Sequence, residues 1–69
     1  MKPADLMRRL NRLARLRGWE IKAAEGGNLT KVTLNGRRTT IVRHTADLKT
    51  GTFRAILKQL GLTDTDLEV

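Results

Sequence analysis

The feature that most constrains the fold is the dipeptide Asn35-Gly36, which stands between two stretches of alternating residues. Asn-Gly is typical of a type I′ turn, in which both central residues adopt positive φ and two antiparallel strands are joined directly. We therefore predict a β-hairpin whose strands run over residues 28–34 and from Arg37 to about Arg43. Because the turn has two residues, it also predicts the register, with Leu34 opposite Arg37.

This register sorts the hairpin side chains onto two faces, because successive residues of a strand point to opposite sides. Val32 and Leu34 then face a core, together with Ile41 of the next strand. The other face carries basic and hydroxyl side chains, and His44 follows just beyond its end. Its predicted cross-strand pairs are Leu29 with Val42, Lys31 with Thr40 and Thr33 with Arg38.

Helical spacing marks both ends of the chain. Near the start, an apolar stripe of Leu6, Leu10, Leu13 and Ala14 follows Pro3 and Asp5 and stops at Gly18. Near the end, a second stripe of Phe53, Ile56, Leu57 and Leu60 stops at Gly61, with Thr50 or Thr52 as the expected N-cap. A first strand is predicted where Trp19, Ile21 and Ala23 alternate with polar residues, and Gly26-Gly27 then turns the chain.

The order helix, three strands, helix predicts an α+β fold, in which two helices cover one face of a three-stranded antiparallel sheet. We expect a single domain over residues 1–62, followed at 63–69 by a short acidic tail that frays. Opposite the first apolar stripe lie Arg8, Arg12 and Arg15. This arginine face is either a solvated helix surface or a phosphate-binding one, and the sequence leaves both open.

Composition restricts the function. No apolar run approaches the roughly 18 residues of a membrane span, no secretion signal follows the N-terminus, and the absence of cysteine suits a reducing cytoplasm. A single histidine with scattered carboxylates has no metal-ligand spacing, and no phosphate loop is present, so we expect no metal, no cofactor and no membrane partner. Residues 1–63 carry fourteen cations against four carboxylates, a balance that favours a polyanionic partner such as nucleic acid.

Three segments of the chain, namely residues 35–44, residues 47–62 and Leu6 to Trp19, resemble HicA-type toxins. Residues 35–44 resemble that family's GRR…PRH segment, with Val42 in place of the proline. Residues 47–62 resemble its LKxGTLRxILKQxGL helix, and Leu6 to Trp19 is similar to its opening, so that the resemblance covers residues 3–62. It implies an α-β-β-β-α fold like that of double-stranded-RNA-binding domains. It also implies a stress-response toxin of a type II toxin–antitoxin system, a ribosome-independent mRNA endoribonuclease inhibited by a HicB-type antitoxin.

The chain departs from this family at its catalytic position. The family motif after the glycine turn is Gly-Ser-His or Gly-x-Asn-His, whereas this chain has Gly26-Gly27-Asn28-Leu29. Leu29 therefore stands where the resemblance places the catalytic histidine. A shift of one residue puts Asn28 there instead, but strand alternation favours Leu29, because it turns Leu29 outward and Asn28 inward.

Leucine neither accepts nor donates a proton, so the chain as written is expected to cleave RNA poorly. His44 either replaces the missing histidine or is a surface group, and the histidine loss is either natural or engineered. The alternatives to a ribonuclease are a non-catalytic RNA-binding module and an antitoxin-interaction domain. The predicted RNA contacts are Lys31, Arg37, Arg38, Arg43, His44 and Lys49.

Overall fold

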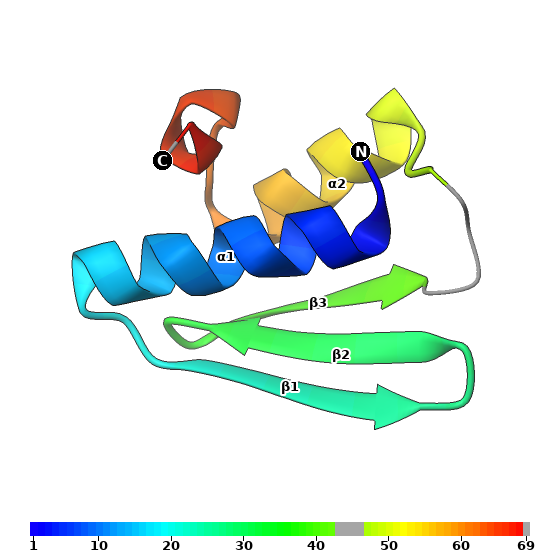
Figure 1. Cartoon of the computed structure of the whole chain (residues 1–69), viewed down its shortest axis with the longest axis horizontal. Helices are drawn as coiled ribbons and strands as arrows, with labels where there is room; N and C mark the ends of the chain where they lie inside the picture. Colours follow the sequence, from blue (N-terminus) through cyan, green and yellow to red (C-terminus); the bar gives the residue numbers. More distant parts are fainter. Residues whose placement is uncertain (43–46, 69) are drawn as a thin grey trace.

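A computed structural model describes residues 1–42 and 47–68, and its element order agrees with the predicted α-β-β-β-α arrangement (Figure 1). One further element, a short 3₁₀ helix, follows the second helix. The elements are α1 (Pro3–Arg17), β1 (Ile21–Gly26), β2 (Leu29–Leu34), β3 (Arg37–Val42), α2 (Thr50–Leu60) and η1 (Asp64–Leu67). Within the described ranges, no helix combines the length and the apolarity that crossing a bilayer requires.

The three strands form an antiparallel sheet in the order β1-β2-β3, held by two tight hairpins. Asn35 and Gly36 have φ of 51° and 82°, as the predicted I′ turn requires, and Leu34 pairs with Arg37. The other hairpin turns at Gly27-Asn28, with Gly27 at φ 58°. Since Asn28 belongs to this turn, β2 begins one residue later than predicted.

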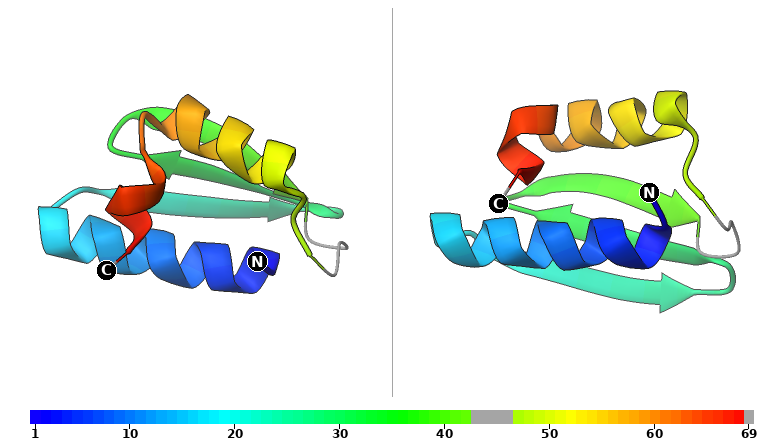
Figure 2. Two further views of the ribbon diagram at one scale, coloured as in Figure 1. Left: turned by 90° about the horizontal axis from the view of Figure 1, so that it is seen from above. Right: turned by 45° about the horizontal axis from the view of Figure 1, so that its top comes forward.

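Both helices lie on the same side of the sheet, and the core is the layer between them and the sheet (Figure 2). The leucine stripe of α1 packs there against the strand residues that the hairpin register turns inward. The fully buried members are Leu6, Leu10, Leu13, Val32, Leu34, Ile41 and Leu67. The predicted apolar faces are thus confirmed for α1, β2 and β3.

The first strand begins two residues later than predicted, includes Gly26, which was expected in the turn, and is more exposed than its alternation suggests. Trp19 precedes β1, where it is half-buried against the core, and its backbone N–H donates to the Ala14 carbonyl. Ala23 is exposed although the register turns it to the helix side, because β1 is an edge strand. The sheet therefore has a covered part under the helices and an open margin at β1.

Both α-helices end at the predicted glycines, but the predicted N-cap of α2 is wrong. Gly18 and Gly61 adopt the left-handed conformation with φ of 68° and 71°, which glycine tolerates without a side-chain penalty. The N-cap of α2 is Lys49, which makes no side-chain cap hydrogen bond, and Thr50 is already helical. Neither threonine near this end is therefore the cap residue that we predicted.

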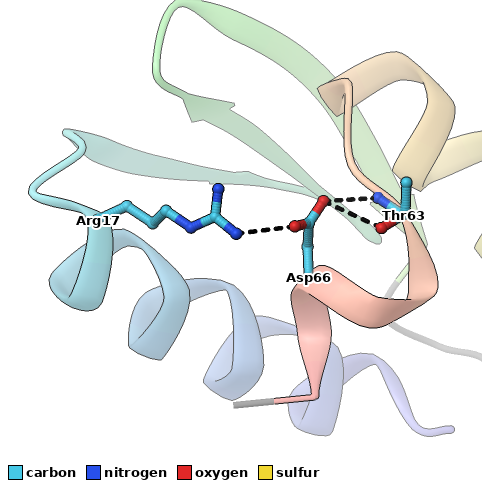
Figure 3. Close-up of polar contacts among 3 residues, drawn as sticks. All are labelled: Arg17, Thr63 and Asp66. Carbon is cyan, nitrogen blue, oxygen red and sulfur yellow. Dashed lines mark hydrogen bonds and ion pairs between the residues drawn. The ribbon is translucent and has the colours of Figure 1, made fainter.

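The segment after α2 does not fray over residues 63–68, which corrects the prediction made for the tail. Leu67 is 2% exposed within the core, and Arg9 donates to its carbonyl oxygen. Asp66 accepts from the Thr63 amide and hydroxyl and forms an ion pair with Arg17 at 2.8 Å (Figure 3). Asp66 therefore belongs both to a capping box with Thr63 and to an ion pair that joins η1 to α1.

Candidate nucleic-acid interface

The face of the sheet that points away from the helices, here called the open face, carries the predicted mixture of cations and hydroxyls. The observed pairs between β2 and β3 are those predicted from the hairpin turn. By strand alternation, β1 contributes Lys22 and Ala24 to the same face. The open face thus consists of Lys22, Ala24, Leu29, Lys31, Thr33, Arg38, Thr40 and Val42.

Leu29 projects from the open face, as its place in the alternation predicts. It is the first residue of β2, with Gly26 on one side and Val42 on the other, and it is 38% exposed. Asn28 is exposed in the preceding turn and does not point inward, so that part of the prediction is wrong. Lys31 lies two residues along the same strand, about 7 Å away by the rise of a β-strand.

The centre of the open face is hollowed between Lys31 and Arg38. On the open face, Ala24, Lys31, Thr33, Arg38 and Thr40 line this hollow. Its lining also includes Gln59 of α2, whose Oε1 accepts a hydrogen bond from the Thr39 hydroxyl on the helix side. Ala24 lies opposite Lys31, and its single methyl group leaves space beside the lysine. Cations with adjacent hydroxyls can hold phosphate and ribose oxygens, because ammonium, guanidinium and hydroxyl groups all donate hydrogen bonds.

Sequence reasoning missed Lys22, which adds a third cation to the open face. It lies opposite Thr33, and its Nζ is 3.0 Å from Glu20 Oε1. Both side chains are about three-quarters exposed, so this ion pair contributes little to stability. The signal was present in the sequence, because pairing across the Gly27-Asn28 turn sets Lys22 opposite Thr33 in the same way as the second hairpin sets its own register.

Four predicted contact residues lie elsewhere or outside the described ranges. Arg37 pairs with Leu34 and therefore points to the helix side, where a methyl group added to Gly61 would come within 2.9 Å of its Nε. Lys49 is the exposed N-cap residue of α2, and the first turn of α2 lies toward the end of the sheet where β2 begins (Figure 1). Arg43 and His44 fall in residues 43–46, outside the described part of the chain.

Within residues 1–42 and 47–68, the open face offers charge and hydrogen bonds but no aromatic ring on which a base could stack. The two aromatic side chains of the sequence, Trp19 and Phe53, pack partly buried against the core. Over residues 1–42 and 47–68, no three histidine, cysteine, aspartate or glutamate side chains gather as metal ligands would. The geometry of the open face therefore fits a phosphate backbone better than unstacked bases.

Comparison with known protein families finds a match that covers most of this chain. A family described as "HicA toxin of bacterial toxin-antitoxin" matches residues 7–62, a stretch that includes all three strands, α2 and most of α1. No curated protein and no solved structure gives a significant match.

Proposed function

The chain belongs to the HicA toxin family of bacterial toxin–antitoxin systems, and from this premise we propose that it has the fold of an mRNA endoribonuclease with a substituted catalytic position. In this proposal Leu29 stands where the catalytic histidine belongs. The open face binds messenger RNA independently of the ribosome, and the chain as written cleaves RNA poorly. Membership of the family also implies an antitoxin partner.

The observation that carries the proposal is the exposed position of Leu29 on the open face. It is 38% exposed at the start of β2, on the face that also carries Lys31 and Arg38. A side chain at this place meets a bound phosphate directly, and no packing requirement of the core explains its identity. The position therefore suits a group that acts on RNA, although leucine itself has no such chemistry.

The chemistry of RNA cleavage explains why this substitution matters. In one route the 2′-hydroxyl attacks the adjacent phosphorus, one group removes the hydroxyl proton, and another protonates the leaving 5′-oxygen. Histidine performs such transfers near neutral pH, and a positioned acid or base contributes roughly 10²–10⁴ in rate. Lys31 and Arg38 can offset the negative charge that develops on the phosphate, but neither replaces a titrating group at Leu29.

The same observation favours a second candidate, a non-catalytic RNA-binding module. An open face that keeps Lys31, Arg38 and the threonine hydroxyls retains the means to bind a phosphate backbone without cleaving it. The two candidates differ in what happens when a histidine is supplied at position 29. A cleaving toxin regains activity, whereas a pure binding module does not.

For the antitoxin, we propose a HicB-type protein that presents acidic groups to the open face. An inhibitor that covers Leu29 must also meet Lys31 and Arg38, and carboxylates complement these cations as phosphates do. Occupation of the open face would then exclude RNA from it. Mixing the purified proteins before adding RNA would show competition if this is right, and simultaneous binding would contradict it.

RNA binding by the open face can be tested with a matched pair of double variants. Lys31→Gln/Arg38→Gln removes two cations from the open face, and Arg54→Gln/Lys58→Gln removes two exposed cations from α2. Fluorescence anisotropy with a labelled single-stranded RNA, measured over a series of salt concentrations, reports both affinity and its salt dependence.

The slope of log K against log salt is negative, and we expect its magnitude to be smaller by about 1.4 in the open-face variant, since each single-strand phosphate contact contributes about 0.7. The α2 variant should leave the slope close to that of the unmodified chain. Equal slopes for the two variants, or no RNA binding by the unmodified chain at low salt, would contradict the proposal.

A further inference from the structure

We propose that the outward face of α1 is a second RNA-phosphate-binding surface, formed by Arg8, Arg12 and Arg15. This surface, here called the arginine row, lies on the opposite side of the molecule from the open face. The inference rests on the proposed RNA-binding function and extends it, because it assigns to the same RNA a second contact region away from Leu29.

The arginine row follows from the way α1 packs. Leu6, Leu10 and Leu13 are fully buried against the sheet, so the opposite side of the helix faces solvent. Residues at spacings of three and four lie one above another on a helix, with neighbouring Cβ atoms about 5–6 Å apart. The row therefore extends about 10 Å along α1, from the 1.5 Å rise of each residue.

A polar hollow adjoins the N-terminal half of the row. Met1, Asp5, Arg8, Arg9 and Arg12 line it, so three guanidinium groups surround one carboxylate. Asp5 is 3.7 Å from Arg8, and the two side chains are 47% and 80% exposed. Such an exposed pair contributes little and is readily exchanged for a contact with an incoming phosphate.

The residue type also points to phosphate. All five basic residues of α1 are arginines, and none is a lysine. The planar guanidinium donates two parallel hydrogen bonds to a phosphate, whereas lysine acts as a point charge. A surface charged only for solubility does not require this pair of parallel hydrogen bonds.

Two other arginines of α1 have partners in η1. Arg9 donates to the Leu67 carbonyl and Arg17 pairs with Asp66, so these two hold η1 against the helix. The spacing of the arginine row brings like charges together, with Arg8 and Arg12 at i, i+4 and Arg12 and Arg15 at i, i+3. Each such pair destabilises an isolated helix by about 0.2–0.5 kcal/mol. This gathering of like charges is consistent with a role in binding an anion.

RNA is favoured over an acidic protein as the occupant because of the positions of the two surfaces. An antitoxin that covers Leu29 approaches the open face, whereas α1 lies on the other side of the sheet (Figure 2). The arginine row is on the side of α1 opposite the buried leucines and therefore faces away from the sheet. A flexible polyanion can pass round the edge of a molecule whose shortest extent is 17 Å. Consequently a long RNA reaches both surfaces, whereas a very short one fills only one.

The test compares Arg8→Gln/Arg12→Gln with Arg54→Gln/Lys58→Gln, because both variants remove two cations spaced i, i+4 from an exposed helix surface. Binding is measured over a range of salt with a single-stranded RNA of about 20 nucleotides and one of about four, the lower end of the known footprints of small single-strand-binding folds. The charge-keeping variant Arg8→Lys/Arg12→Lys is measured alongside, and circular dichroism verifies that each variant is folded.

For the long RNA, we expect Arg8→Gln/Arg12→Gln to lower the salt slope by about 1.4 and the α2 variant to leave it unchanged. The lysine variant should keep the slope and bind more weakly, because it retains the charge without the two parallel hydrogen bonds of the guanidinium group. For the short RNA, Arg8→Gln/Arg12→Gln should have a smaller effect than Lys31→Gln/Arg38→Gln.

An unchanged slope in Arg8→Gln/Arg12→Gln would overturn the inference, and so would loss of antitoxin capture in that variant without an effect on RNA. If Arg8→Gln/Arg12→Gln fails to fold, the lysine variant decides, and binding equal to that of the unmodified chain overturns the inference. If Lys31→Gln/Arg38→Gln alone lowers the slope, the inference fails while the proposed function stands. If the unmodified chain binds no RNA, both fail.

Discussion

Replacing Leu67 by alanine tests whether the C-terminal segment is part of the folded domain. Leu67 is 2% exposed in the core, and buried Leu→Ala substitutions cost about 2–5 kcal/mol. Because Leu67 lies near the chain end, where the surroundings can relax, we expect the lower part of that range, about 2–3 kcal/mol. A chain of this length has a total free energy of unfolding of about 3–10 kcal/mol, so the loss is a large fraction of it.

Urea unfolding followed by circular dichroism measures this loss. With an m-value of about 1 kcal/mol/M, typical of small proteins, the midpoint should fall by about 2–3 M. Leu16→Ala is the matched control, because Leu16 is 66% exposed on α1 and its truncation should change the stability by no more than about 0.5 kcal/mol. If both variants unfold at the midpoint of the unmodified chain, residues 63–68 are not held against α1 and the reasoning is refuted.

Two further predictions concern the ends of η1 and α2. The hydrogen bond from the Thr63 amide lowers the pKa of Asp66 although desolvation opposes it, and the Thr63 hydroxyl and Arg17 add to the lowering. The stabilisation of the folded chain by ionised Asp66 is therefore complete above the ordinary aspartate pKa range and is lost as the pH falls below about 4. Asp66→Asn should accordingly lower the free energy of unfolding at neutral pH and leave it equal to that of the unmodified chain at the acid end of a pH series. Gly61→Ala should destabilise the chain by about 1 kcal/mol or more, since φ at Gly61 is +71° and the added methyl group would meet Arg37. Gly51→Ala has open space in α2 and should stabilise the chain by up to about 1 kcal/mol. Thermal unfolding that ranks these two glycine variants in the opposite order would contradict the reasoning.

The parts of the fold that the sequence predicted are those governed by local rules. The Asn35-Gly36 turn determined the register between β2 and β3, and this register placed Leu29 and Lys31 on the outward face. The helix stops at Gly18 and Gly61 likewise follow from a conformation that glycine tolerates.

The errors arose where long-range packing decides. Residues 63–68 are polar and short, so composition predicted fraying, but Leu67 reaches the core and Asp66 meets Arg17, which is 49 residues earlier in the chain. Ala23 has the inward position of a strand residue and is exposed, because no helix covers the edge strand β1 at that point. Neither the contacts of residues 63–68 nor the exposure of Ala23 can be inferred from the local sequence pattern.

For the candidate interface, the register also explains which predicted residue is displaced. Arg37 was named for its charge, although the turn that sets it opposite Leu34 directs it to the helix side. Lys22 was overlooked because β1 was aligned only with its own alternation and not with β2. Charge alone predicts only a class of partner, and pairing across both hairpins was needed to identify the residues of the open face.

The most direct test of the central claim is RNA cleavage by Leu29→His, measured beside Leu29→Gln as a polar control of similar size that does not titrate. Because position 29 projects from the open face next to the cationic hollow, the histidine variant should cleave labelled RNA roughly 10²–10⁴ times faster than the unmodified chain. The glutamine variant should show no such gain. Cleavage by Leu29→His that does not exceed that of Leu29→Gln would contradict the assignment of Leu29 to the catalytic position.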